Sequence, residues 1–216
     1  MSSSDLPSLT SSQVRQVDAL VAERFGIPID WLMEAAGWQV ARLVDSPAVV
    51  VCGVGNNAGD GFAAARHLHR WGRLARVCCI DPERVHGPAG VELAALRSTG
   101  AKVSTDLSFD GADVVVDAIF GTGLNRPPGG RFAEWIEAIN ASGKNVVAVD
   151  VPSGLDADTG VAYSPSVRAD LTVALGLPKP GLSGEVVVVD IGVPLQAYAA
   201  VGVEVDSKLF GDRITL

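Results

Sequence analysis

An acidic residue lies among glycines in residues 53–61, which read Gly-Val-Gly-Asn-Asn-Ala-Gly-Asp-Gly. The segment follows the apolar run 48–52 and leads into a helical pattern that starts at Phe62. A strand, a glycine-rich turn and a helix in this order form a nucleotide-type binding site, because backbone N–H groups are free at the start of the helix. Asp60 puts negative charge in the first helical turn, where a simple dinucleotide fingerprint would hold a pyrophosphate. We therefore expect a nucleotide-like ligand at a site that also needs an acid, a base or a cation ligand.

Two further polar segments follow predicted strands. Residues 117–127 close the strand that begins at Ala112, and residues 150–156 close the strand that begins at Asn145. In a doubly wound sheet of strand order 3-2-1-4-5, strands one and four are neighbours, and ligands bind there at the carboxyl ends of the strands. The three segments are therefore predicted to meet in one crevice.

The chemistry available in this crevice is that of oxygen ligands and carboxylic acids. Its reactive side chains are expected to be Asn57, Asp60, Asp117, Asp150 and Ser153, with no His or Cys. Such a set disfavours zinc and copper and suits a hard cation, held by carboxylate, amide, hydroxyl and backbone carbonyl oxygens. Several carboxylates in one pocket also spread their pKa values, so that one of them can exchange a proton near neutrality. The glycines at positions 53, 55, 59, 61, 121 and 123 are expected to allow positive φ angles and close approach of the backbone to phosphate.

Each of these residues also has a structural explanation. Asp60 can be a favourable acid at a helix N-terminus, Asp117 can form a turn, and Asp150 and Ser153 can shape the turn around Pro152. Lys179, between two prolines, is either a phosphate ligand or a solvated loop lysine.

The elements that must position the site alternate between strands and helices. Thr10 and Gln13 form a capping box for a first helix that ends at Gly26, and Asp30 can cap a second helix. Strands are predicted near 48–53, 74–80, 101–104, 112–119, 145–150, 171–175 and 186–190, and later helices near 61–71, 88–98 and 131–141. The strands are continuous hydrophobic runs, as in a sheet covered on both faces. We predict an α/β fold: a three-layer, Rossmann-like, doubly wound, mostly parallel sheet with helices on both faces and two extra N-terminal helices.

Length and composition limit the number of domains, the kinds of partner and the cellular location that can be expected. The 216 residues favour one domain, 9–216, preceded by a flexible segment 1–8. The net charge of −8 argues against a nucleic-acid partner, and the absence of a long apolar run argues against a membrane span. The first residues lack the pattern of a secretory signal, and the three cysteines resemble buried hydrophobic residues of a reducing compartment. A cytoplasmic protein is expected.

The chain resembles the NAD(P)H-hydrate epimerases, also called the YjeF N-terminal domain family. The resemblance lies in residues 55–61, 64–68, 117–123, 150–156 and 178–182, and it extends over about residues 9–194. It implies an isomerase that interconverts the R and S epimers of hydrated NADH and NADPH at C6 of the nicotinamide ring. It also implies a homodimer whose functional partner is a separate NAD(P)H-hydrate dehydratase.

The resemblance also implies the roles of single residues. A potassium ion would be held by Asn57, Asp117 and Ser153. The hydrated dinucleotide would be bound by Asn56, Asn57, Ala58, Gly59, Asp60, Gly121, Thr122, Gly123, Leu124, Asn125, Arg126, Pro127 and Asp150. Two positions depart from the family pattern, which usually has Gly at position 58 and Asn at position 35, where this chain has alanine.

Epimerisation requires acid–base chemistry at the hydrated ring. The ring nitrogen can expel a protonated C6 hydroxyl and leave a flat iminium, which water attacks from either face. Asp117 is the first candidate for the carboxylic acid that moves the proton, and Asp60 is the second.

Two other functions fit parts of the sequence. A nicotinamide dehydrogenase would use the Gly-x-Gly-x-x-Ala pattern of residues 53–58, with Asp81 on the ribose. A non-catalytic Rossmann-like scaffold would keep the fold but would be expected to lose the acidic side chains.

Overall fold

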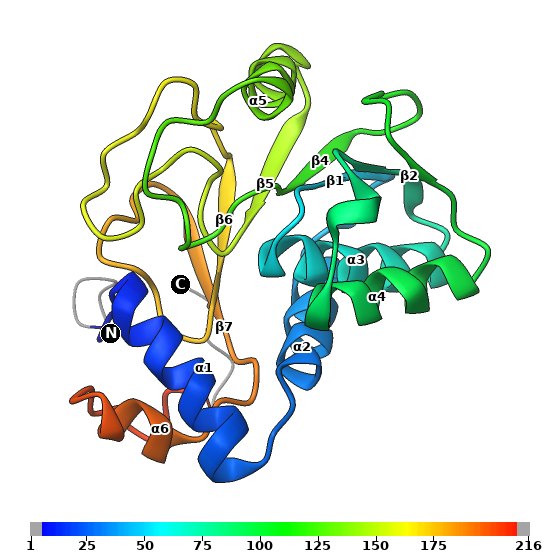
Figure 1. The fold of residues 1–216 in the computed structure, drawn as a ribbon. Helices are drawn as coiled ribbons and strands as arrows, with labels where there is room; N and C mark the ends of the chain where they lie inside the picture. Colours follow the sequence, from blue (N-terminus) through cyan, green and yellow to red (C-terminus); the bar gives the residue numbers. More distant parts are fainter. Residues whose placement is uncertain (1–5, 211–216) are drawn as a thin grey trace.

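A single seven-stranded parallel sheet forms the centre of the protein in the computed structural model, which describes residues 6–210 (Figure 1). The strands are β1 (Ala48–Cys52), β2 (Leu74–Cys79), β3 (Val103–Ser104), β4 (Val114–Ala118), β5 (Asn145–Val149), β6 (Leu171–Leu175) and β7 (Val186–Val189). Their order in the sheet is β3-β2-β1-β4-β5-β6-β7. The predicted fold class is confirmed, and every predicted strand is present.

The change of winding direction falls between β1 and β4, which pair in parallel from Ala48 opposite Val114 to Cys52 opposite Ala118. From this point the chain runs outward to β3 on one side and to β7 on the other. The carboxyl ends of all seven strands therefore lie at one edge of the sheet. Ligand sites of open α/β sheets form at this edge, next to the change of direction.

Helices cover both faces, as predicted. On one face, α2 (Ile29–Arg42), α3 (Asn56–Arg70) and α4 (Gly87–Ser98) pack on the largest hydrophobic cluster. On the other face, α5 (Arg131–Ala141) packs through Trp135 and its buried isoleucines. Burial on both sides explains why β1 and β4 consist almost entirely of valine and other small apolar residues.

The N-terminal helix α1 (Ser11–Phe25) begins and ends as predicted. Thr10 and Gln13 form the capping box, and Gly26 ends the helix with a φ of 64°. The prediction for α2 was wrong in one detail, because the helix is entered at Pro28 and Asp30 makes no capping hydrogen bond. The carboxylate of Asp30 lies in the first turn, where it favours the helix through its charge alone.

Helix α3 starts at Asn56, five residues before the predicted start, so the glycine-rich segment is mostly helix and not loop. Asp60 is its fifth residue, and the first turn contains no acid. None of the six glycines of the two motifs has a positive φ, which corrects that prediction. Two of them are required by space: a Cβ at Gly53 would collide with the carbonyl of Ile119, and one at Gly61 would lie 2.5 Å from the Cβ of Ala118.

Helix α1 packs away from the sheet centre, beside a short C-terminal helix that was not predicted, α6 (Leu195–Ala200) (Figure 1). Leu6 packs against the same cluster, and the backbone N–H of Leu9 donates to the carbonyl of Pro178. The predicted flexible segment 1–8 and the domain limits 9–216 lie partly outside the described residues. Within residues 6–210, every helix is too short or too polar to traverse a lipid bilayer.

A charged cluster joins α2, α3 and α4. Arg66 pairs with Glu34, and its guanidinium also lies 3.8 Å from Glu92, which is only 5% exposed. One carboxylate oxygen of Glu92 has no hydrogen-bond partner within residues 6–210. Burial raises the pKa of Glu92 to about 7, although Arg66 acts in the opposite direction.

We predict that Glu92→Gln stabilises the protein at pH 8 by about 1–2 kcal/mol and has little effect at pH 4.5. The native state binds this proton more tightly than the unfolded chain, whose glutamate has a pKa of 4.5. The contribution of Glu92 to the free energy of unfolding is therefore fully present below pH 4.5, and it is lost as the pH rises through about 7. Urea unfolding at both pH values measures the difference, and exposed Glu23→Gln on α1 is the control. Equal effects of Glu92→Gln at the two pH values would contradict the prediction.

Candidate functional site

The three predicted segments converge on one cavity of about 860 Å³ at the carboxyl ends of β1 and β4. The predicted residues that line it are Asn56, Asn57, Asp60, Gly121, Thr122, Gly123, Leu124, Asn125, Arg126, Pro127 and Asp150. Four predicted residues do not reach its wall: Ala58, Gly59, Asp117 and Ser153. No His or Cys is among the residues that line the cavity.

Asp117 lies behind the cavity wall, in β4, and is fully buried. Its carboxylate accepts hydrogen bonds from the backbone N–H and the hydroxyl of Ser153, at 2.8 and 2.7 Å, and from the backbone N–H of Ile119 at 3.2 Å. Burial raises the pKa of Asp117 to about 6, and these hydrogen bonds oppose the rise. Its catalytic role stays a prediction, but a carboxylate with both oxygens occupied and no exposure is better placed as an anchor or ligand than as a proton carrier.

Asn57 lies in the first turn of α3 and lines the cavity. Its side-chain amide nitrogen is buried and has no hydrogen-bond partner within residues 6–210. A Cβ at Gly121 would lie 3.3 Å from the amide oxygen of Asn57, so the glycine leaves room for this side chain. The amide N–H group therefore borders the cavity with unused donor capacity, which indicates a ligand that carries a hydrogen-bond acceptor.

The three residues predicted to hold a cation have the chemistry of a hard-ion site. The amide oxygen of Asn57, the carboxylate of Asp117 and the hydroxyl of Ser153 are the types of atom that such an ion binds. The Ser153 hydroxyl also lies 3.3 Å from the carbonyl oxygen of Phe120. Among residues 6–210, no group of three or more His, Cys, Asp or Glu side chains is arranged to hold a metal. A cation here would depend on amide, hydroxyl and carbonyl oxygens together with one carboxylate.

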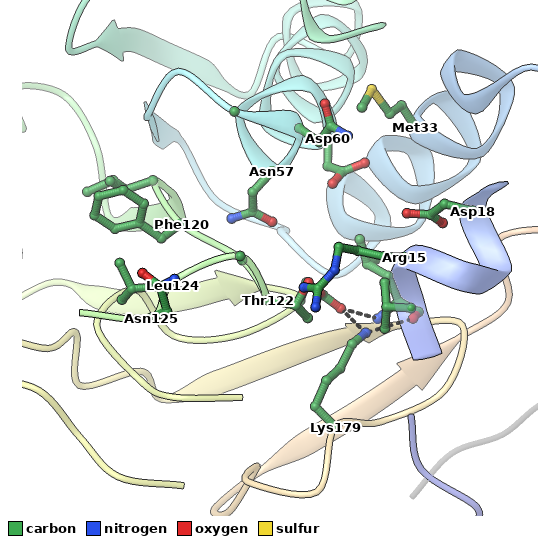
Figure 2. Close-up of a pocket in the computed structure, with 18 of the residues that line it drawn as sticks. Arg15, Asp18, Met33, Asn57, Asp60, Phe120, Thr122, Leu124, Asn125 and Lys179 are labelled. Atoms are coloured by element: carbon green, nitrogen blue, oxygen red, sulfur yellow. Dashed lines mark hydrogen bonds and ion pairs between the residues drawn. The ribbon is translucent and has the colours of Figure 1, made fainter. Parts of the chain in front are cut away.

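Asp60 points into the cavity from α3 (Figure 2). It is 9% exposed, and within the described chain its carboxylate makes no hydrogen bond or ion pair. Burial raises its pKa well above the ordinary value, and the negative charges of Asp150 and Asp18 act in the same direction. Burial therefore favours the protonated form of Asp60, which can donate its proton to a bound ligand.

Asp150 and Lys179 form a buried ion pair on the opposite side of the cavity from α3 (Figure 2). Lys179 is 4% exposed and also donates to the carbonyl of Leu175 at 3.1 Å. It is therefore not a solvated loop lysine. Asp150 has a φ of 66°, which is rare for a residue with a side chain and directs its carboxylate to the lysine and to the backbone N–H of Leu175.

The sequence motifs missed several residues of the cavity wall. Helix α1 contributes Arg15 and Asp18, α2 contributes Met33, and Tyr198 comes from α6. The position of Asp18 could have been noticed in the sequence. It lies four residues after Val14 and three before Val21, so it falls on the apolar face of α1. A charged residue on the buried stripe of an amphipathic helix has a partner or a function.

A model of the family described as YjeF-related protein N-terminus matches residues 29–181. The NAD(P)H-hydrate epimerase of Limosilactobacillus fermentum is 40% identical over 200 residues, covering 88% of this chain and 92% of the relative. The NAD(P)H-hydrate epimerase of Rhodopirellula baltica is 36% identical, covering 88% and 86%. The bifunctional NAD(P)H-hydrate repair enzyme Nnr of Thermofilum pendens is 42% identical, but this chain spans only 40% of its length.

The fold is also similar to a solved structure. The crystal structure of the yeast protein YNL200c superposes with a TM-score of 0.80 and 26% sequence identity, covering 97% of this chain and 98% of the yeast chain. The likeness extends over the whole sheet and its helices, including the N-terminal pair.

Proposed function

The chain belongs to the family of YjeF-related N-terminal domains, and from this premise we propose that it is an NAD(P)H-hydrate epimerase. It would interconvert the R and S forms of hydrated NADH and NADPH at C6 of the nicotinamide ring. The observation that carries this proposal is the convergence of three segments on one cavity: Asn56, Asn57 and Asp60, residues 121–127, and Asp150. The carboxyl group of Asp60 is buried in the cavity wall and has no partner within residues 6–210.

The cavity suits a modified dinucleotide. The N-terminus of α3 turns free backbone N–H groups toward the wall, where the pyrophosphate of a nucleotide is favoured. Arg126 is exposed and lines the same cavity, so it can pair with a phosphate. The acidic side chains of the cavity wall would then contact the hydrated nicotinamide ring.

Asp60 is the residue best placed for proton transfer. Its raised pKa lets it donate a proton to the C6 hydroxyl, while the ring nitrogen releases its electron pair into the N1–C6 bond and water leaves. Return of water to C6 releases a proton, which a carboxylate accepts. Attack on the opposite face gives the other epimer, and no atoms or electrons are gained or lost overall.

We also propose that Asn57, Asp117 and Ser153 hold a potassium ion. The oxygen atoms of these three side chains support this assignment, because carboxylate, amide and hydroxyl oxygens are the ligands of a hard cation. When bound, the ion supplies a fixed positive charge beside the ligand. Asp117 would then serve the site as a cation ligand, and it would also hold the turn at Ser153 through the two hydrogen bonds from this residue.

We predict that the thermal midpoint is several degrees higher in potassium chloride than in an equal concentration of tetramethylammonium chloride, because an ion that binds only the native state stabilises it. The difference should be lost in Asn57→Ala, which removes one oxygen ligand. Scanning calorimetry measures both effects without any substrate. Equal midpoints of the unmodified chain in the two salts would remove the cation from the proposal.

The function itself is tested with one purified epimer of each hydrate. The unmodified chain should convert it into the equilibrium mixture much faster than the spontaneous reaction, as followed by chromatography. Tight binding of the hydrates without faster conversion would instead support a non-catalytic role for this fold.

We further propose that the protein is a cytoplasmic homodimer that acts with a separate NAD(P)H-hydrate dehydratase. The three free, buried cysteines support a reducing compartment. On α2, Trp31 and Trp38 are 67% and 41% exposed, and large exposed apolar side chains of this kind are typical of interfaces. Light scattering of the purified protein should give twice the chain mass, and the chain mass alone would contradict the dimer.

A further inference from the structure

Asp18 is an acidic residue of the cavity wall that none of the sequence motifs contains. It lies on α1, far in sequence from the glycine-rich segments, and is half-buried. Figure 2 shows the carboxylates of Asp18 and Asp60 directed toward the same space from two different helices. Burial raises the pKa of Asp18 to about 6, and the charge of Asp150 adds to this rise.

The cavity wall near these carboxylates contains polar groups that a ligand could bind. Neither Asp18 nor Asp60 makes a side-chain hydrogen bond or ion pair within residues 6–210. The side-chain amide of Asn57, in the same wall, is 8% exposed and its nitrogen is unpartnered. Groups buried without partners carry a desolvation cost that a bound polar molecule would relieve.

Asp18 and Asp60 differ from Asp150 in their charged neighbours. Lys179 neutralises Asp150 directly and interacts only at longer range with Asp18 and Asp60. Arg15 lines the same cavity and is exposed. Within residues 6–210, Asp18 and Asp60 are thus two carboxyl groups with raised pKa values and no fixed partner, held by different helices in the wall of one cavity.

Epimerisation requires two such groups, because water leaves one face of the ring and returns to the other. A single carboxyl group on one side of a flat iminium serves only the face that it touches. Resting on the proposed function, we propose that Asp18 is a second catalytic acid–base residue, which acts on the ring face opposite to that served by Asp60.

The protonated carboxyl group of Asp60 gives its proton to the C6 hydroxyl, the C6–O bond breaks, and water leaves as the N1–C6 double bond forms. A water on the other face forms a new C6–O bond, and Asp18 takes its proton while the electron pair returns to N1. Asp18 ends protonated and Asp60 ionised, which is the state that runs the reverse conversion, and exchange with solvent resets the pair.

The test uses one purified epimer of the hydrate in water labelled with oxygen-18. The unmodified chain should incorporate label at C6 and invert it. Asp18→Asn should lower inversion by at least about tenfold, while label still enters the starting epimer, because Asp60 alone can expel and return water on its own face. Mass spectrometry of the separated epimers gives both rates, and Asp18→Glu should recover part of the inversion.

Glu23→Gln, an exposed change of equal charge on the same helix, is the matched control and should leave both rates unchanged. A parallel fall of inversion and label exchange in Asp18→Asn would overturn the proposal, since it would mean that Asp18 only shapes the cavity. Unchanged inversion would overturn it as well. Absence of conversion by the unmodified chain would refute the epimerase function itself, and this inference with it.

Discussion

Asp60→Asn is expected to slow the interconversion of the hydrate epimers by about 10²–10⁴-fold, the usual contribution of a positioned acid or base. The carboxyl group is buried at the cavity wall and has no partner within residues 6–210, and burial raises its pKa well above the ordinary value. Asparagine has nearly the same shape but cannot exchange a proton. Because it also removes a buried carboxyl group that costs stability when ionised, the variant should unfold at the same or a higher temperature.

Asp117→Asn is the informative comparison for Asp60→Asn. If Asp117 acts as a cation ligand, this variant loses the thermal shift with potassium, whereas Asp60→Asn keeps it. Chromatographic rates and calorimetry on both variants separate the two roles. Normal turnover of Asp60→Asn, together with loss of turnover but an intact potassium shift in Asp117→Asn, would make Asp117 the proton carrier.

Lys179→Met is expected to destabilise the protein by about 3–5 kcal/mol, the largest loss that we predict for a single substitution. Both members of the pair are buried, so the change leaves the Asp150 carboxylate without its counter-charge. Asp150 also holds a positive φ between β5 and the following turn, so its neighbours cannot easily relax around an unpaired charge. Urea unfolding at neutral pH measures the loss.

The double variant Asp150→Asn with Lys179→Met tests the cause. It removes the unpaired charge and should recover a large part of the stability that Lys179→Met loses. Lys102→Met, an exposed substitution of the same kind, should change stability by less than about 0.5 kcal/mol. A double variant no more stable than Lys179→Met would show that packing, and not the charge of Asp150, explains the loss.

The strands of the sheet and the location of the cavity could be predicted from the amino-acid sequence. Runs such as Val114–Val116 can only be buried strands, and glycine-rich segments after three of these strands must meet where the winding changes direction. The ends of α1 were also predicted correctly, because the Thr10 capping box and the left-handed Gly26 depend only on residues that are close in the sequence. The start of α3 was misplaced because glycines usually indicate a turn, whereas here they allow a helix to pack closely on the sheet.

Which side chains of the site border the cavity depends on packing between segments that are far apart in the sequence. The sequence gives no reason to prefer Asp60 or Asp117 as the residue that faces the ligand. In the structure Asp60 borders the cavity, whereas Asp117 is buried and accepts a hydrogen bond from the hydroxyl of Ser153. Asp18 comes from a segment far from the motifs, and its place in the wall depends on how α1 packs. Lys179 was considered as a phosphate ligand, but its pairing with Asp150 depends on how the loop after β6 packs. Burial, pairing and the resulting pKa shifts are properties of packed neighbours, so no spacing along the chain could reveal them.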